Sequence, residues 1–318
     1  MTSPLIRRSR PEDDEAILRV YNTIQSDFVP MSVEFYRHWY RTRPPGTFLE
    51  RYVAVAGDEI VGSLDLAERH EYAEPGVYQA YLDVAPDHRG RGIGGALFEL
   101  AERRAREQGA RALRALVRAH HSESISFAAH RGMRPTARID RPSRLDVSRA
   151  NLARSDERER ALATEGILIR TLAETGFTDQ EMLRRIMLLA HEAGSDIPGS
   201  PPRPSPDFDR WLADLTTNPN KSPDRFWIAF EGDQPVGVAW LGAIAGEHAD
   251  NGLTGVARSH RGRGVARALK GRTVHWARDN GIHYIHTANN VANAPMLAIN
   301  TDLGYQPLPE EIEMEKEI

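Results

Sequence analysis

The sequence HRGRGIGG at residues 88–95 occurs a second time, as HRGRGVAR, at residues 260–267. The two copies are related by a sequence offset of 172 (260 − 88 = 172). Each copy follows a short apolar segment and precedes the apolar spacing of an amphipathic helix. A glycine-rich turn between a strand and a helix directs backbone N–H groups toward an anion. We therefore expect the function to reside at these two loops.

The rest of the chain repeats in step with the loops. Gly109 and Gly281, and also Gly132 and Gly304, are related by the same offset (281 − 109 = 172; 304 − 132 = 172). Two copies of one domain explain this pattern. The sequence predicts an N-terminal domain over residues 1–150, a polar, Arg- and Glu-rich linker helix over 151–166, and a C-terminal domain over 167–318.

Periodicity predicts a similar order of elements in both copies: a strand, helical segments, a hairpin, a strand into the glycine loop, a helix, a strand, a helix and a closing strand. The closing strands are expected at 138–147 and 313–318. Residues 198–206 form a Pro-rich loop without a counterpart in the first copy. An aromatic helix near residues 33–40 could line a binding pocket, although its spacing favours core packing for at least half of Phe35, Tyr36, Trp39 and Tyr40.

Composition excludes several classes of protein. The chain is 40% hydrophobic and 27% charged, which is a globular profile. It contains no Cys, so disulfides, thiolate metal sites and a cysteine nucleophile are excluded. A net charge of −4 argues against a nucleic-acid partner. No apolar run approaches the roughly 18–20 residues of a membrane span, and the first ten residues lack a signal-peptide core, so we expect a cytoplasmic protein without a membrane partner.

Two other interpretations of the motifs are disfavoured. Gly90-x-Gly92-x-x-Gly95 spells the dinucleotide-binding fingerprint, but residues 112–119 lack the acidic side chain that this fold requires. His120-His121 and the pair His283/His286 lack a third ligand at metal spacing, so we expect no metal. His88 and His260 are interpreted as loop-packing residues.

At these loops the sequence resembles the GNAT superfamily of acyl-CoA-dependent N-acyltransferases, in both copies. Residues 84–94 match the family's pyrophosphate loop, and residues 256–266 match it with Arg258 where Pro is common. Residues 287–305 resemble the family's later segment, with His121 in the first copy at the position of Asn293. The resemblance implies an α/β (mixed α+β) fold of two tandem GNAT domains, each a central mixed β-sheet flanked by helices.

The resemblance also implies acetyl-CoA as co-substrate, without a metal. It assigns cofactor binding to Val84, Arg89, Gly90, Arg91, Gly92, Gly94 and Gly95 in the first copy, and to Val256, Arg261, Gly262, Arg263, Gly264, Ala266, Asn289 and Asn293 in the second. A backbone N–H at a β-bulge near Val84 or Val256 would polarise the thioester carbonyl.

By the same resemblance, the reaction is direct attack of a primary amine, from a small molecule or a peptide, on the thioester of acetyl-CoA. The tyrosine that serves as the acid in many members is replaced by Ala128 and Asn300. The strand-borne carboxylates Asp83 and Asp250 are the candidate catalytic residues. The alternatives are that one of the two copies is degenerate, or that the chain is a non-catalytic acyl-CoA-binding or sensor protein. A monomer and a homodimer are both compatible with the sequence.

Overall fold

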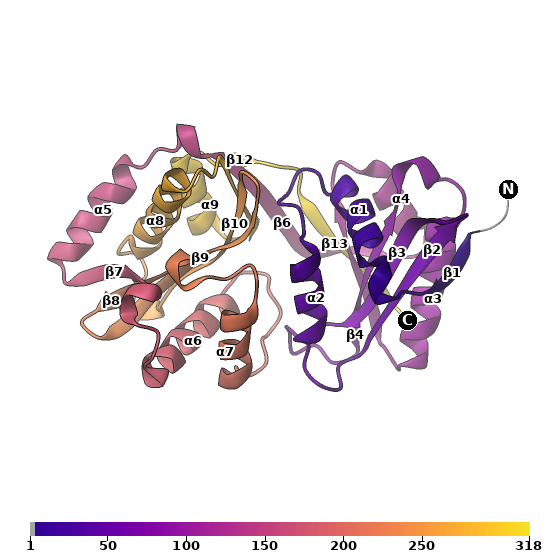
Figure 1. Ribbon diagram of the computed structural model, residues 1–318, viewed down its shortest axis with the longest axis horizontal. Helices are drawn as coiled ribbons and strands as arrows, with labels where there is room; N and C mark the ends of the chain where they lie inside the picture. Colours follow the sequence, from indigo (N-terminus) through magenta and orange to yellow (C-terminus); the bar gives the residue numbers. More distant parts are fainter. Residues whose placement is uncertain (1–3) are drawn as a thin grey trace. The chain divides into compact units, whose positions relative to one another are not determined.

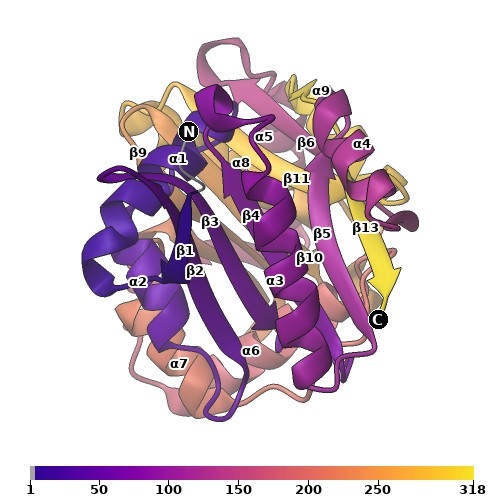
Figure 2. The same ribbon diagram turned by 90° about the vertical axis from the view of Figure 1, so that its right-hand side faces the viewer.

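The computed structural model describes residues 4–318, and its contacts divide the chain into two compact units. Unit 1 comprises Met1–Ile139 and Pro309–Ile318, and unit 2 comprises Asp140–Leu308. Figure 1 colours the chain by sequence and labels most of its helices and strands, and Figure 2 also labels β5 and β11.

Unit 1 is a mixed sheet with helices on both faces. Its elements are β1 (Leu5–Arg8), α1 (Asp14–Ile24), α2 (Val33–Arg41), β2 (Leu49–Ala56), β3 (Glu59–Glu68), β4 (Val77–Val84), α3 (Ile93–Glu107), β5 (Ala112–Arg118), α4 (Ser122–His130) and β13 (Glu311–Glu317). The strand order is β1-β2-β3-β4-β5-β13. Only β4 and β5 pair in parallel. This is the mixed sheet that the resemblance to the GNAT superfamily implies.

The alternation of side chains assigns the two faces of the unit 1 sheet. Tyr78, Ala80 and Leu82 of β4 belong to the core that packs against α3, and Figure 2 shows α3 crossing this sheet. Val53 of β2 belongs to a second core with residues of α1 and α2. Because successive strand residues point to opposite faces, Asp83 lies on the α1–α2 face.

Unit 2 repeats this architecture. Its elements are the C-terminal part of β6 (Arg134–Asp146), α5 (Ala153–Thr164), β7 (Ile167–Thr171), α6 (Gln180–Ser195), α7 (Phe208–Thr217), β8 (Phe226–Glu231), β9 (Gln234–Ala245), β10 (His248–Val256), α8 (Val265–Asp279), β11 (Tyr284–Asn290), α9 (Ala294–Leu303) and β12 (Gln306–Pro307). The strand order is β6-β11-β10-β9-β8-β7, and β12 pairs with β6. Only β10 and β11 pair in parallel.

The closing strands are exchanged between the two copies. β13, the last strand of the second copy, pairs with β5 of unit 1 from Glu311↔Arg118 to Glu317↔Ala112 (Figure 2). Reciprocally, residues 140–146 of β6 pair with β11 of unit 2. The unit boundaries at 139/140 and 308/309 therefore differ from the expected domains 1–150 and 167–318.

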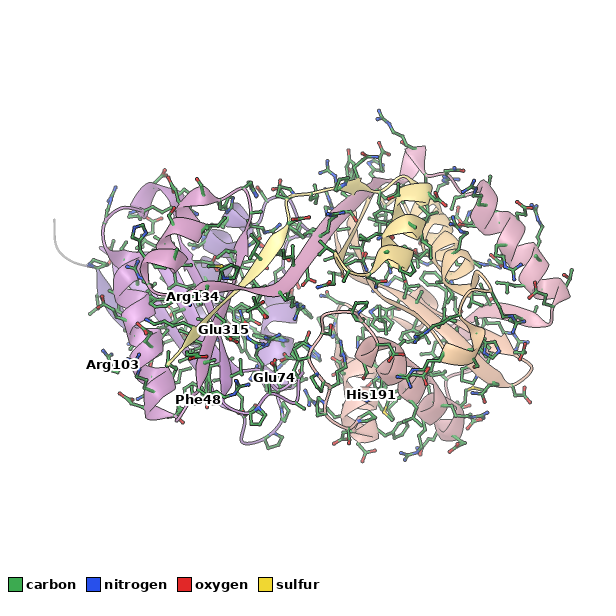
Figure 3. All side chains as sticks on the ribbon, turned by 180° about the vertical axis from the view of Figure 1, so that it is seen from behind. Phe48, Glu74, Arg103, Arg134, His191 and Glu315 are labelled. Carbon is green, nitrogen blue, oxygen red and sulfur yellow. The ribbon has the colours of Figure 1, made fainter. Side chains whose placement is uncertain are left out.

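Ion pairs tie β13 into the unit 1 sheet. Arg114 of β5 donates to Glu315 at 2.6 Å and to Glu74 at 2.8 Å, and both acids are labelled in Figure 3. Arg69 donates to Glu313 at 2.9 Å, where both side chains are buried. Buried charges are stable only when they are paired in this way. The acidic face of β13 therefore matches the arginines of unit 1.

The expected linker helix over 151–166 is not a solvated spacer. It is α5, whose Leu162 is fully buried in the same core as Ala268 of α8. Ser155 lies so close to α8 that a Cβ built at Gly271 would stand 2.7 Å from its Cβ. α5 is therefore part of unit 2.

Candidate functional site

The two central strands of unit 1, β4 and β5, separate before β4 reaches the glycine loop. β4 and β5 pair over only three positions, from Val77↔Ala112 to Gln79↔Arg114. Both strands then continue, to Val84 and Arg118, while each remains paired on its outer side with β3 or β13. The result is a fork whose open end lies at the carboxyl ends of two parallel strands, where open α/β sheets bind ligands.

Unit 2 contains the same fork. β10 and β11 pair only from His248↔Tyr284 to Asp250↔His286, although the strands continue to Val256 and Asn290. β10 also carries register shifts against β9 between Ala249 and Thr254. In contrast, β4 pairs with β3 without a shift from Tyr78 to Val84. The bulge expected near Val84 or Val256 is therefore found in β10 only, a few residues before Val256.

The two glycine loops have the same backbone. Gly90 and Gly92 have φ of 73° and 81°, and Gly262 and Gly264 have φ of 78° and 77°. Positive φ at these positions is accessible to glycine at little cost. Arg89 Nε donates to the carbonyl of Val84 at 3.2 Å, and Arg261 Nε donates to that of Val256 at 3.1 Å. These arginines therefore brace each loop against the end of its strand.

The glycines of the first loop serve two purposes. A Cβ built at Gly90 or Gly92 would meet no atom within 4 Å, so the backbone there is open to a ligand. A Cβ at Gly94 would stand 3.1 Å from the Phe127 ring, and one at Gly95 would stand 2.7 Å from Arg131. Gly94 and Gly95 therefore also let α4 approach α3.

The charges of the two loops differ. Arg261 and Arg258 both pair with Asp196, and they hold the pKa of that carboxyl well below its usual value. Arg263 pairs with Glu231 at 3.1 Å and with Glu165 at 3.3 Å. In unit 1, Arg91 donates to the carbonyl of Asp87 at 2.8 Å. Within residues 4–318, no carboxylate lies within 4.0 Å of the Arg89 or Arg91 guanidinium. The first loop thus keeps its positive charge for an anion.

Asp83 lies on β4, at the open part of the unit 1 fork. Its carboxylate is half-buried and has no hydrogen-bond or ion-pair partner in the described part of the chain. Burial raises the pKa of Asp83 to about 7, Asp65 adds to this effect, and Arg89 opposes it. An unpaired carboxyl that titrates near neutrality can accept a proton from a bound amine.

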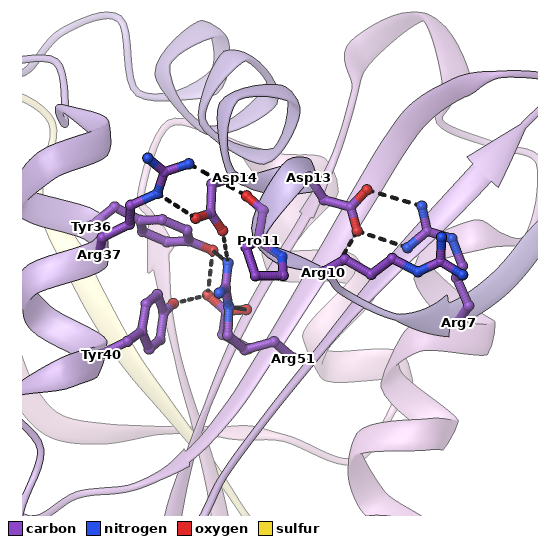
Figure 4. A network of polar contacts seen from close by, with 10 residues as sticks. Arg7, Arg10, Pro11, Asp13, Asp14, Tyr36, Arg37, Tyr40 and Arg51 are labelled. Atoms are coloured by element: carbon purple, nitrogen blue, oxygen red, sulfur yellow. Dashed lines mark hydrogen bonds and ion pairs between the residues drawn. The ribbon is translucent and has the colours of Figure 1, made fainter.

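Asp65 of β3, whose charge acts on Asp83, belongs to a polar network that also contains Tyr36, Tyr40 and Arg51 of Figure 4. The hydroxyls of Tyr36 and Tyr40 on α2 both donate to its carboxylate. Arg51 pairs with Asp14 at 2.8 Å and lies over both tyrosine rings. Tyr36 is 5% exposed, so it packs in the core, as its helical spacing favours.

Asp250 lies at the fork of unit 2, as the last residue of β10 that pairs with β11. Burial raises the pKa of Asp250 to about 6, and the positive charge of Lys270 opposes this rise. Lys270 of α8 is 1% exposed, and its Nζ lies 4.8 Å from the centre of the Tyr305 ring. Burial lowers the pKa of Lys270 to about 7.

Sequence reasoning missed Lys270. The repeat aligns it with Phe98 (270 − 98 = 172), which lies in the core of unit 1. A lysine at the position of a core aromatic residue was the available signal, because lysine is almost never fully buried without a partner.

The position of Asp83 is closed in unit 2. Its counterpart in the repeat is Gly255 (255 − 83 = 172). A Cβ built there would stand 2.3 Å from the Cβ of Ala193 on α6. The helix packs directly on the strand, so no side chain fits at that position. The two units therefore present different groups at equivalent forks.

Comparison with protein families gives two separate matches along the chain. The model of the acetyltransferase (GNAT) family matches residues 15–133 and again residues 181–305. The chain belongs to the GNAT acetyltransferase family. It carries two GNAT domains in tandem.

Solved structures share this tandem fold. A tandem GNAT protein from the clavulanic acid biosynthesis pathway is 20% identical, with a TM-score of 0.75 over 99% of this chain and 98% of that chain. A GCN5-related N-acetyltransferase from Sphaerobacter thermophilus is 22% identical, with a TM-score of 0.71 over 99% of this chain and 95% of that chain. A search of curated proteins gave no match.

The asparagines of the second GNAT domain are held within the protein. Asn289 accepts from Nδ2 of Asn300 at 2.7 Å, and Asn293 caps α9 by accepting from the N–H of Met296 at 3.4 Å. Oδ1 of Asn300 is buried without a partner in the described chain. His121 takes the helix N-cap position of Asn293 in the first domain. Asn300, at the position where the resemblance leads us to expect a tyrosine, therefore leaves an acceptor unsatisfied within the described chain.

Neither a metal centre nor a membrane span is found within residues 4–318. These residues contain no group of three or more His, Cys, Asp or Glu side chains that could hold a metal ion. None of their helices combines the length and the apolar character needed to cross a membrane.

Proposed function

We propose that this GNAT protein is an N-acetyltransferase that transfers the acetyl group of acetyl-CoA to a primary amine of a small molecule or a peptide. The observation that carries the proposal is the fork of unit 1, where an open glycine loop lies above an unpaired carboxylate, Asp83. Binding and proton acceptance are thereby combined at the ends of two adjacent strands.

The residues of the first loop fit the pyrophosphate of acetyl-CoA. The open backbone at Gly90 and Gly92 can supply N–H donors, and the Arg91 guanidinium forms no ion pair within residues 4–318. Arg89 holds the loop to the strand end through the carbonyl of Val84. Several convergent N–H groups and a charge-assisted arginine bind phosphate far better than a helix dipole alone.

In the reaction, acetyl-CoA supplies the activated acyl group. The amine nitrogen forms a bond to the carbonyl carbon, the C–S bond breaks, and the thiolate of CoA leaves. Asp83 accepts the proton that the attacking nitrogen loses. The absence of Cys is consistent with direct attack without a cysteine acyl-enzyme. The position of the family's tyrosine acid is Ala128 in this domain, so the leaving thiolate takes its proton from water.

Unit 2 is proposed as a second, weaker acyl-CoA site with Asp250 as its carboxylate. Its loop arginines already pair with Asp196, Glu231 and Glu165, so a phosphate must compete with these acids. The same observation favours a regulatory role for this domain, as a sensor of acyl-CoA.

The test is calorimetric titration of acetyl-CoA into three proteins: wild type, R89A/R91A and R261A/R263A. We expect two sites in the wild type. R89A/R91A should weaken the tighter site by about 10- to 100-fold, because charge-assisted hydrogen bonds contribute about 1.5–3 kcal/mol. R261A/R263A should affect only the weaker site. Unchanged binding in both variants would exclude the glycine loops as the binding site.

Release of free thiol from acetyl-CoA across a panel of amines then separates an enzyme from a sensor. An enzyme releases thiol in proportion to the acylated amine, and R89A/R91A lowers this rate. Tight binding of acetyl-CoA without amine-dependent thiol release would instead support the sensor.

A further inference from the structure

Arg118, the last residue of β5, is a buried guanidinium with an unused donor. The residue is 7% exposed, and its Nε lies 3.4 Å from Glu311. Its Nη2 donates to Oε1 of Gln25, and its Cζ lies 3.6 Å from the centre of the Phe28 ring. Nη1 is buried and has no hydrogen-bond partner in the described chain. A buried N–H without a partner is costly, so Nη1 is a donor available to a bound ligand.

The register of β4 and β5 places Arg118 and Asp83 at the same distance along the two strands from their last paired residues. The last paired residues of the two strands are Gln79 and Arg114. Asp83 and Arg118 each lie four positions further along, and both lie on the α1–α2 face because that spacing is even. They do not form an ion pair in the described chain, because the strands have separated.

Tyr21 of α1 lies within the electrostatic reach of both groups. The pKa of Tyr21 is raised to about 12, mainly by burial and also by the negative charges of Asp83 and Glu311, and the positive charge of Arg118 opposes this rise. α1, β4 and β5 therefore bring the Asp83 carboxylate and the Arg118 guanidinium to one region of unit 1, where the two groups do not form an ion pair with each other.

Unit 2 lacks this pair. In the repeat, Gly255 replaces Asp83 and Asn290 replaces Arg118 (290 − 118 = 172). Asn290 uses its side chain within the protein, as an acceptor from the N–H of Ala292 at 2.9 Å. The combination of opposite charges is thus a property of the first domain alone.

We propose that unit 1 acylates an amine that also carries a carboxylate, with the amine at Asp83 and the carboxylate at Nη1 of Arg118. The proposal rests on the proposed N-acetyltransferase function and specifies its acceptor. An amine with a carboxylate complements both the unpaired carboxyl of Asp83 and the unpartnered Nη1 of Arg118, and a simple amine would leave this buried N–H unsatisfied. A site built to bind a polar group discriminates strongly against ligands that lack it.

The experiment compares matched acceptors with acetyl-CoA as donor: α- and ω-amino acids, each against its own carboxamide. For wild type, we expect kcat/KM to favour the acid by about 10- to 100-fold, the factor that a charge-assisted hydrogen bond provides. R118M should abolish this preference mainly by raising KM for the acids, and R118K should restore part of it. Binding of the acids to wild type and R118M, measured by calorimetry without acetyl-CoA, should show the same loss.

Two controls separate the proposal from a structural effect. E311Q removes the ion-pair partner of Nε but leaves Nη1 in place, so the preference for the acid should persist. Acetyl-CoA affinity should be the same in R118M and wild type, because the glycine loop is unchanged.

Several outcomes would overturn the proposal while the N-acetyltransferase function stands. One is thiol release with amines at equal rates for acids and carboxamides. Another is a change in the preference between acetyl-CoA and succinyl-CoA caused by R118M. That result would mean that Arg118 binds a carboxylate of the acyl donor and not of the acceptor. No thiol release with any amine would contradict the function itself, and acid binding that depends on Arg118 would then still support the site.

Discussion

Asp83 and Lys270 are two ionisable side chains whose surroundings move their pKa values toward neutrality from opposite directions. The pKa of Asp83 is raised to about 7, and that of Lys270 is lowered to about 7. Burial is the main cause for both, because it disfavours the charged form. The charge state of each side chain therefore changes with pH near neutrality, and measurements at several pH values test its effect on activity or on the free energy of unfolding.

Replacement of Asp83 by Asn should remove an acid limb from the pH profile. In wild type, kcat/KM for the amine should fall as pH drops below about 7, because protonated Asp83 cannot accept a proton. D83N should lose most of the activity and this limb with it. The thiol-release rate between pH 5.5 and 9 measures both effects. An unchanged profile in D83N would assign the base elsewhere.

D83N should also be more stable than wild type at high pH. A carboxyl whose folded pKa lies above its unfolded pKa opposes folding above the folded value, and this penalty disappears below the unfolded value near 3.8. The melting temperature of D83N should exceed that of wild type at pH 8 and equal it at pH 4. D58N, in an exposed hairpin turn, serves as the control and should show no such difference.

Lys270→Met should stabilise the protein by about 1–3 kcal/mol at pH 6, the scale found when a buried charge is replaced by an apolar side chain. The folded pKa of Lys270 lies below the unfolded one, so its penalty is complete below pH 7 and fades as pH rises toward 10.5. Urea unfolding at pH 6 and pH 9 should show the larger gain at pH 6. A loss of stability at pH 6 would show that Lys270 is a required partner of Asp250.

At the scale of elements, the packing of one helix makes the two domains different. α6 lies on β10 at Gly255, and a Cβ there would stand 2.3 Å from Ala193. In unit 1 the equivalent position accommodates Asp83 on the α1–α2 face. The same sequence repeat thus yields one open and one closed strand surface.

Gly255→Ala should therefore destabilise unit 2 by about 1–3 kcal/mol, since an added methyl group forces the backbone of α6 to move. Asp83→Ala, at the equivalent position in unit 1, should cost far less because a side chain is already present there. Thermal unfolding of the two variants gives the comparison. Equal costs would mean that α6 adapts without strain.

Local sequence pattern predicted most elements but not how all of them pack. The helices Ser122–His130 and Ala294–Leu303 have the expected bounds, as polar caps and flanking glycines mark their ends. Helix α7 (Phe208–Thr217) was not predicted. The segment 151–166 was predicted to be a solvated helix because it is polar and rich in Arg and Glu, yet Leu162 is fully buried against α8.

At the scale of the whole molecule, the exchange of closing strands divides the chain differently from the repeat. Unit 1 needs residues 309–318, and unit 2 needs residues 140–146 of β6. Strand pairing is a long-range interaction, and it determines which segments fold as a unit.

A fragment of residues 140–308 should therefore fold alone, because it contains all of unit 2. Fragments 1–150 and 167–318 should be unfolded or aggregated, since the first lacks β13 and the second lacks β6 and α5. Each would expose an unpaired strand edge at β5 or β11. Circular dichroism and urea unfolding of the three fragments provide the test. Cooperative folding of 1–150 would show that β13 is dispensable.

The sequence alone determined the family, the tandem repeat, the two glycine loops and most of the elements, because these depend on residue type at short range: positive φ at glycine, apolar periodicity and a repeated motif. Only the tertiary structure decided which loop has arginines without ion pairs to carboxylates, and that Lys270 is buried. It also decided with which sheet β6 and β13 pair. Those properties depend on partners far away in the chain. Asp83 and Arg118 are distant in the sequence, and they are level only because two parallel strands pair in one register and then separate.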